Sequence, residues 1–92
     1  MTTRVQRRSV RLTAAAPVEI EPGIILPAGI YEGVEKRLGV PLMAGMSWTP
    51  PEYHLELSEV QLVAMGAKPT PNMISTEYDL SKFVRLGQIT VS

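Results

Sequence analysis

The stretch PGIILPAGIYEG, residues 22–33, decides how this chain folds back on itself. It places two Pro-to-Gly turn signals around three consecutive apolar residues. Proline presets φ for the second position of a turn, and glycine accepts the positive φ that a type II turn requires next. The stretch therefore forms either two successive turns, or one bulge at Pro22–Gly23 followed by a single hairpin at Pro27–Gly29.

We favour the second interpretation, because it gives one bent strand over residues 18–26 and a neighbouring strand of matching length over residues 30–36. It predicts positive φ at Gly23 and Gly29, so that an alanine at either position destabilises the fold. Three adjacent apolar residues cannot all point to one face of a strand. Ile25 is therefore left on the wrong face, where we expect it to contact a partner.

The rest of the chain carries regular strand and helix patterns. Alternation of apolar and polar residues predicts further strands in three segments, residues 10–13, 53–57 and 88–91. Ser58 and Gln61 have the spacing of a capping box, and they predict a short helix that ends at Gly66. Asp79 is placed to cap a second short helix that ends at Gly87.

Short hairpin links between the strands favour antiparallel pairing. The sequence therefore predicts a mainly β (α+β) fold, which is a small antiparallel sheet or a partly closed barrel. We expect four to five short strands, with two short helices in the C-terminal half. Ninety-two residues predict a single domain, 1–92, in which residues 1–8 are a candidate for a flexible basic arm.

Residues 38–52, LGVPLMAGMSWTPPE, predict a long connection between strands, because their Pro and Gly content opposes regular structure. The segment is nevertheless apolar, and Met and Trp are favoured at contact surfaces. We predict that Met43, Met46 and Trp48 bind a partner together with Ile25. In the alternative, the segment folds back and plugs an open end of the barrel.

The composition limits the possible functions. Hydrophobic residues make up 45% of the chain and charged residues 20%, which excludes a disordered chain. There is no cysteine, so disulfides, thiol catalysis and cysteine–zinc sites are excluded. No apolar run is long enough for a membrane span or a signal-peptide core, and we expect a cytoplasmic protein.

Arginines are concentrated at the start of the chain, although the net charge is zero. Arg4, Arg7, Arg8 and Arg11 precede every acidic residue. A basic terminus can bind phosphates, which makes a nucleic-acid-binding or regulatory protein the second hypothesis. Against it, nucleic-acid-binding proteins tend to be basic overall. The arginines can equally protect an edge strand from aggregation.

Catalytic groups are few. His54, the only histidine, is followed by Glu56 on the same expected strand face, an arrangement that could form a general base oriented by a carboxylate. No P-loop, dinucleotide fingerprint or nucleophile elbow is present. We therefore expect no enzyme, no catalytic residues, no cofactor and no metal site.

The sequence favours a small non-enzymatic module for protein binding or assembly, acting as a subunit, an adaptor or an inhibitor. Its expected partner is another protein or a second copy of itself. Nucleic acid is the less favoured partner, and no membrane is expected.

Overall fold

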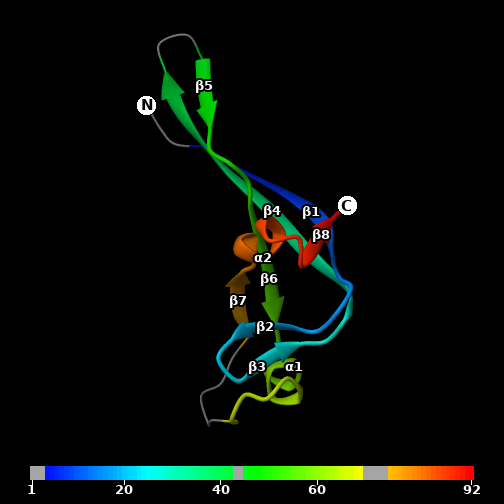
Figure 1. Ribbon diagram of the computed structural model, residues 1–92. Helices are drawn as coiled ribbons and strands as arrows, with labels where there is room; N and C mark the ends of the chain where they lie inside the picture. The colour runs from blue at the N-terminus through cyan, green and yellow to red at the C-terminus, as the bar shows by residue number, and fades with distance from the viewer. Residues whose placement is uncertain (1–3, 43–44, 70–74) are drawn as a thin grey trace.

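The computed structural model describes residues 4–42, 45–69 and 75–92. Within these ranges the chain forms eight strands and two short helices (Figure 1). Their bounds are β1 Arg4–Ala14, β2 Val18–Glu21, β3 Ile24–Leu26, β4 Gly29–Leu42, β5 Gly45–Trp48, β6 Glu52–Leu57, α1 Glu59–Ala64, β7 Thr76–Asp79, α2 Ser81–Arg85 and β8 Ile89–Val91. The mainly β fold and the two helices of the C-terminal half confirm the sequence prediction.

One antiparallel sheet contains six of the strands, in the order β7-β6-β4-β1-β8, with β5 also paired to β4. β1 and β4 pair along the whole of β1, from Arg4 opposite Gly39 to Ala14 opposite Gly29, without a register shift. β2 and β3 form a separate hairpin, inserted between the two long strands. Of the two predicted architectures, the antiparallel sheet is confirmed and the partly closed barrel is wrong, because neither sheet closes on itself within the described residues.

The Pro22–Gly23 interpretation is also wrong. These residues form the tight turn of the β2–β3 hairpin, in which Glu21 lies opposite Ile24. The irregularity in pairing lies instead between Glu19 and Glu21. Both glycines have the predicted positive φ, 83° at Gly23 and 157° at Gly29. Gly29 does not close a hairpin, however, because it begins β4 and pairs with β1.

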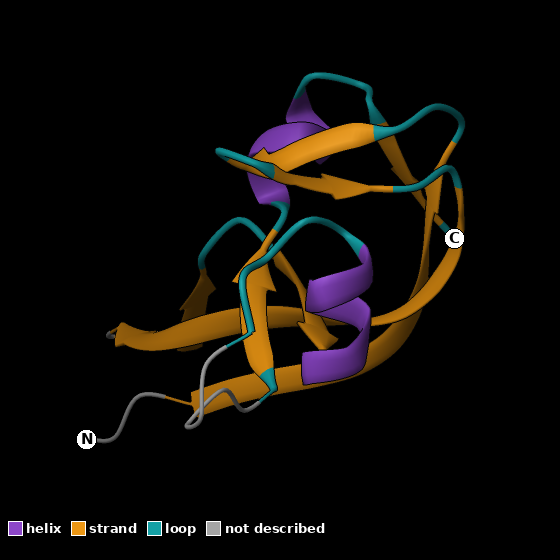
Figure 2. Cartoon of the chain, turned by 90° about the horizontal axis from the view of Figure 1, so that it is seen from below, coloured by secondary structure: helices purple, strands orange, loops and turns teal. Residues whose placement is uncertain are grey.

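The hydrophobic core lies on one face of the six-stranded sheet. Alternate residues of β1 and β6 point into it, namely Val10, Leu12, Ala14, Leu55 and Leu57. The β2–β3 hairpin and the two helices lie over the sheet (Figure 2). They contribute further buried residues, which are Val18, Leu26, Leu62 and Phe83.

Both helices end as the sequence predicts, at glycines with positive φ, 114° at Gly66 and 78° at Gly87. The capping box of α1 is confirmed, since Ser58 accepts from the Gln61 backbone and Gln61 accepts from the Ser58 backbone. The N-cap of α2 is Leu80 rather than Asp79. The Asp79 carboxylate instead accepts hydrogen bonds from the backbone and the hydroxyl of Ser81, one position into the helix.

The irregular connection expected over residues 38–52 is wrong as well. β4 continues to Leu42 and pairs with β5, so much of this segment is a hairpin. Pro41 is accommodated near the end of its strand, where proline is tolerated. Residues 4–8, considered as a flexible arm, belong to β1 and pair with residues 35–39. No helix of the described residues is long and apolar enough to cross a membrane.

Candidate functional site

A three-stranded finger projects from the body of the protein (Figure 1). We use this name for the beginning of β1, the end of β4 and all of β5, which are residues 4–9, 35–42 and 45–48. None of the described side chains of the finger belongs to the hydrophobic core. The finger is therefore held mainly by backbone pairing, and its apolar side chains are available for contact.

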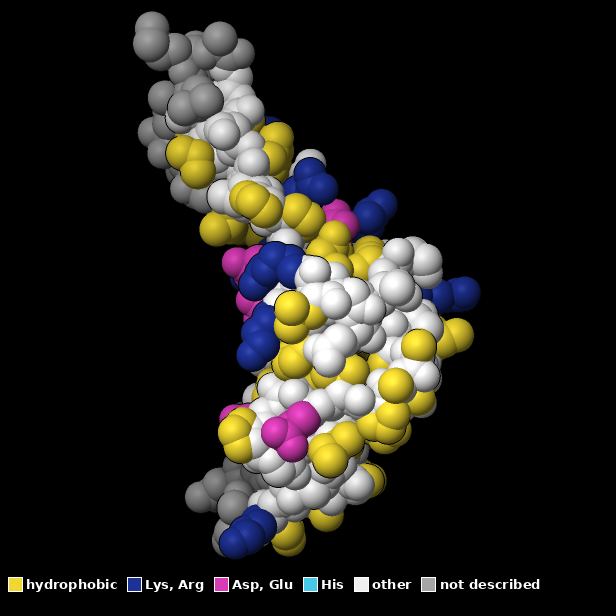
Figure 3. Space-filling model, viewed as in Figure 1, with side chains coloured by type: hydrophobic (Ala, Val, Ile, Leu, Met, Phe, Trp, Pro, Cys, Tyr) yellow, Lys and Arg dark blue, Asp and Glu magenta, His cyan; other side chains and the backbone are white. Residues whose placement is uncertain are grey.

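The outer face of the finger, which is the face turned away from the core, carries an apolar stripe. Val5 lies opposite Leu38 in the β1–β4 register, and Val40 follows two residues later on the same face. Their exposed fractions are 48%, 37% and 44%. Apolar side chains appear on the finger surface beside basic ones (Figure 3). Exposed apolar side chains gathered in this way are typical of an interaction surface.

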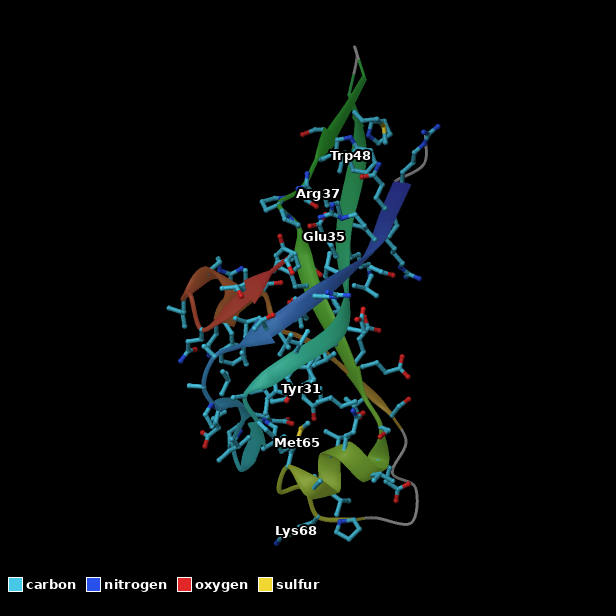
Figure 4. All side chains as sticks on the ribbon, turned by 90° about the vertical axis from the view of Figure 1, so that its right-hand side faces the viewer. Tyr31, Glu35, Arg37, Trp48, Met65 and Lys68 are labelled. Atoms are coloured by element: carbon cyan, nitrogen blue, oxygen red, sulfur yellow. The ribbon has the colours of Figure 1, made fainter. Side chains whose placement is uncertain are left out.

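The opposite face of the finger is more polar. Glu35 accepts a hydrogen bond of 3.0 Å from Arg8 across the strand pair, and the Arg37 Nε lies 3.7 Å from its other carboxylate oxygen. Trp48 lies opposite Gly39, and a Cβ added to Gly39 would meet its ring at 2.7 Å. Figure 4 shows these groups along the finger. The tryptophan thus covers a glycine rather than filling a core.

The partner-binding residues predicted from the sequence lie in two separate places. Met46 and Trp48 are in β5, on the polar face of the finger, and Trp48 is exposed. Ile25 is 46% exposed in β3 and donates its backbone N–H to the Met65 carbonyl. The structure does not bring Ile25 together with the others, because β3 lies at the opposite end of the molecule (Figure 1). Met43 lies outside the described residues.

The four arginines of β1 alternate between its faces, because side chains alternate along a strand. Arg8 pairs with Glu35 and Arg11 lies 3.7 Å from Glu32. In the described parts of the chain, no carboxylate lies within ion-pair distance of Arg4 or Arg7. The arginines therefore form no continuous basic track on one face.

His54 is held between two carboxylates on the outer face of the sheet. Its Nε2 lies 2.9 Å from Glu52 and its Nδ1 lies 2.8 Å from Glu77. The ring lines a shallow hollow of about 220 Å³ together with Val34 and Lys36. Glu56, the expected orienting group, does not contact the ring within the described residues; Glu52 is its hydrogen-bond partner and Glu77 lies at ion-pair distance. Among the described residues, the ring contacts carboxylates and no hydroxyl group.

Glu52, His54 and Asp79 are the described residues that could hold a metal ion, because their ligand atoms lie within 4.8 Å of one another. Both histidine nitrogens already contact carboxylates, and Asp79 accepts two hydrogen bonds from Ser81. Burial tends to raise the pKa of Asp79, but these bonds and the nearby His54 and Arg85 charges lower it overall.

Sequence reasoning missed the apolar stripe of the outer face. A signal for the stripe was present in the sequence, since Leu38 and Val40 are two positions apart and side chains two apart share one face of a strand. The prolines and glycines of residues 38–52 obscured it, because they predicted a loop rather than a strand.

No family model, no curated protein and no solved structure matches this chain.

Proposed function

We propose that the protein is a non-enzymatic module for protein binding or assembly, and that the finger is its contact surface. The observation that carries this is the finger itself, which exposes apolar side chains on strand segments that contribute nothing to the core. Burial of apolar surface by a partner would stabilise the finger, at about 25 cal/mol per Å² of apolar area. A cytoplasmic location remains part of the same proposal.

The partner is another protein or a second copy of this chain, and the two can be separated by sedimentation. A single cysteine, introduced as Lys68→Cys at the end of the molecule opposite the finger, carries a fluorescent label (Figure 4). The labelled protein is sedimented in buffer and in a lysate of its source cells. If the labelled protein sediments faster in buffer than a 10.1 kDa monomer should, it associates with itself. If it sediments faster only in the lysate, it binds another protein.

The matched variants are isosteric. Val5→Thr with Val40→Thr makes the stripe polar without changing its shape, whereas Val60→Thr does the same on α1, where Val60 is 79% exposed. We expect the double variant to sediment as a monomer and the Val60→Thr variant to behave as the parent protein. A monomer in both media, or assembly that survives in the double variant, contradicts the proposal.

Nucleic-acid binding is a second candidate, favoured by the charge of the finger. The finger has a single described carboxylate, Glu35, and five cationic residues, Arg4, Arg7, Arg8, Lys36 and Arg37. A gel-shift titration with duplex DNA tests it. Binding that is unchanged when Arg4 and Arg7 become alanine, or no binding at moderate salt, counts against it.

A further inference from the structure

The outer edge of β1 is open over most of its length. β1 pairs with β4 throughout, but with β8 only at Leu12–Ala14. One further pair of hydrogen bonds, of 2.9 and 3.0 Å, joins Arg11 to Ser92. Among the residues that the structure describes, none pairs with this edge before Arg11. Figure 4 shows β8 beside only the C-terminal part of β1.

The register shows which backbone groups point to the open edge. Arg11 directs both its N–H and its C=O toward Ser92, away from β4. Backbone groups alternate in direction along an antiparallel strand, and the β1–β4 register has no shift. Val5, Arg7 and Ser9 therefore direct their N–H and C=O groups outward. These groups are the template for one more strand.

The positive charge at the open edge of β1 favours an incoming strand with acidic side chains. Arg4 and Arg7 have no carboxylate within 4.0 Å in the described part of the chain, and the finger as a whole is basic. Pairing with β1 of a second copy would bring these arginines close to one another, which is unfavourable. An incoming strand with carboxylates at its polar positions would be attracted to both.

We propose that the open edge of β1 binds an acidic, extended segment of another protein, which adds to the sheet as a strand beside Val5, Arg7 and Ser9. This inference rests on the proposed function and names the class of partner. The backbone groups supply hydrogen bonds, and the arginines supply selection for acidic side chains. Val5 and Arg7 share the outer face and Arg4 lies on the other face, so the segment carries an apolar residue beside Val5 and acidic residues beside Arg4 and Arg7.

Nucleic acid fits this edge less well. The arginines alternate between the two faces and are separated by Val5 and Gln6, whereas a phosphate backbone needs a basic track along one surface. The outward N–H and C=O groups match a peptide backbone in both donors and acceptors. A nucleic acid supplies phosphate acceptors but no matching row of donors.

The probe is a fluorescent peptide of about seven residues, the length of a typical strand, that carries glutamate opposite Arg4 and Arg7, valine opposite Val5 and threonine elsewhere. Its binding to the full chain is followed by anisotropy at low salt. A second peptide has the same sequence with N-methyl groups on its pairing edge, so it keeps its charge but cannot form the ladder. A third replaces glutamate with lysine.

Two protein variants separate the contribution of the backbone hydrogen bonds to peptide binding from that of the arginine charges. Ser9→Pro removes one outward N–H and leaves every arginine in place, with Ser9→Ala as its control. Arg4→Ala with Arg7→Ala removes charge, with Lys68→Ala as its control at the far end of the molecule (Figure 4). We expect Ser9→Pro and the double variant each to weaken binding about fivefold, which corresponds to about 1 kcal/mol and is of the size of one hydrogen bond or of two surface ion pairs.

Binding of the acidic peptide but not of the lysine peptide, weakened by N-methylation and by Ser9→Pro, supports the inference. Equal binding of the N-methylated peptide overturns it and leaves only charge attraction. Duplex DNA that displaces the peptide regardless of Ser9→Pro also overturns it. If no peptide binds while the Val5→Thr and Val40→Thr variant still loses assembly, this inference fails and the proposed function stands; if assembly is also absent, both fail.

Discussion

Gly66→Ala is expected to destabilise the protein by about 2–5 kcal/mol, because it combines a backbone penalty with a clash. Gly66 has φ of 114°, which L-residues rarely adopt. A Cβ at this position would lie 2.4 Å from the Gly23 carbonyl oxygen. That oxygen is backbone in the β2–β3 turn, so it cannot rotate out of the way.

The two contributions can be separated with Gly23→Ala. Gly23 also has a positive φ, 83°, but a Cβ there would meet nothing within 4 Å. It should therefore show the backbone penalty alone, about 1–2 kcal/mol. In Gly66→Ala the turn must also move away from α1, which adds about 1–3 kcal/mol to the loss of unfolding free energy, the usual range for overpacking. The movement is resisted by the hydrogen bond of 3.0 Å from the Ile25 N–H to the Met65 carbonyl.

Urea unfolding at equilibrium measures both variants against the parent protein. Thermal unfolding gives a second reading, since 1 kcal/mol shifts the Tm of a domain of this size by about 4–8 °C. Equal losses in Gly66→Ala and Gly23→Ala would refute the reasoning, because they would mean that the end of α1 does not touch the β2–β3 turn.

Four further substitutions test other parts of the structure. Val40→Thr should alter the unfolding free energy by less than about 0.5 kcal/mol, whereas Leu12→Ala should cost about 2–5 kcal/mol, and urea unfolding compares them. Ser58→Ala should cost about 0.5–2 kcal/mol by the same method, because it removes the capping box of α1. The pKa of Asp79 in the folded protein lies below its unfolded value of about 3.9. The ionised carboxylate therefore stabilises the fold fully above the unfolded pKa, and this stabilisation is lost as the pH falls through the folded pKa. Stability measured from pH 5 downward should therefore fall less steeply in Asp79→Asn than in the parent protein; equal slopes would show that Asp79 is not stabilised by Ser81.

The elements that the sequence predicted correctly are those decided by neighbouring residues. The capping box of Ser58 and the alternation of Leu55 and Leu57 need no distant contact to be recognised. The same holds for the glycines that end the two helices. Such patterns are local, and the tertiary structure agrees with them.

The elements that could not be predicted depend on distant contacts. The residues Pro22–Gly23 suit a turn and a bulge equally. The turn is the conformation that brings the hairpin against the end of α1, where Ile25 bonds to Met65 and Gly23 lies against Gly66. Likewise, β4 continues through Pro41 because β1 and β5 pair with its terminal part, although local composition favours a loop. The finger follows from this pairing, and its outer-face stripe was therefore recognised only once the structure showed that residues 38–42 belong to a strand.

The central claim is that the finger, and not the body, contacts a partner. A photo-crosslinking amino acid placed at Val40, and separately at Val60 on the exposed side of α1, tests it most directly. After irradiation in the source cells, we expect a discrete adduct from position 40 and none from position 60. Adducts of the same size from both positions, or from position 60 alone, would contradict the assignment of the finger as the contact surface.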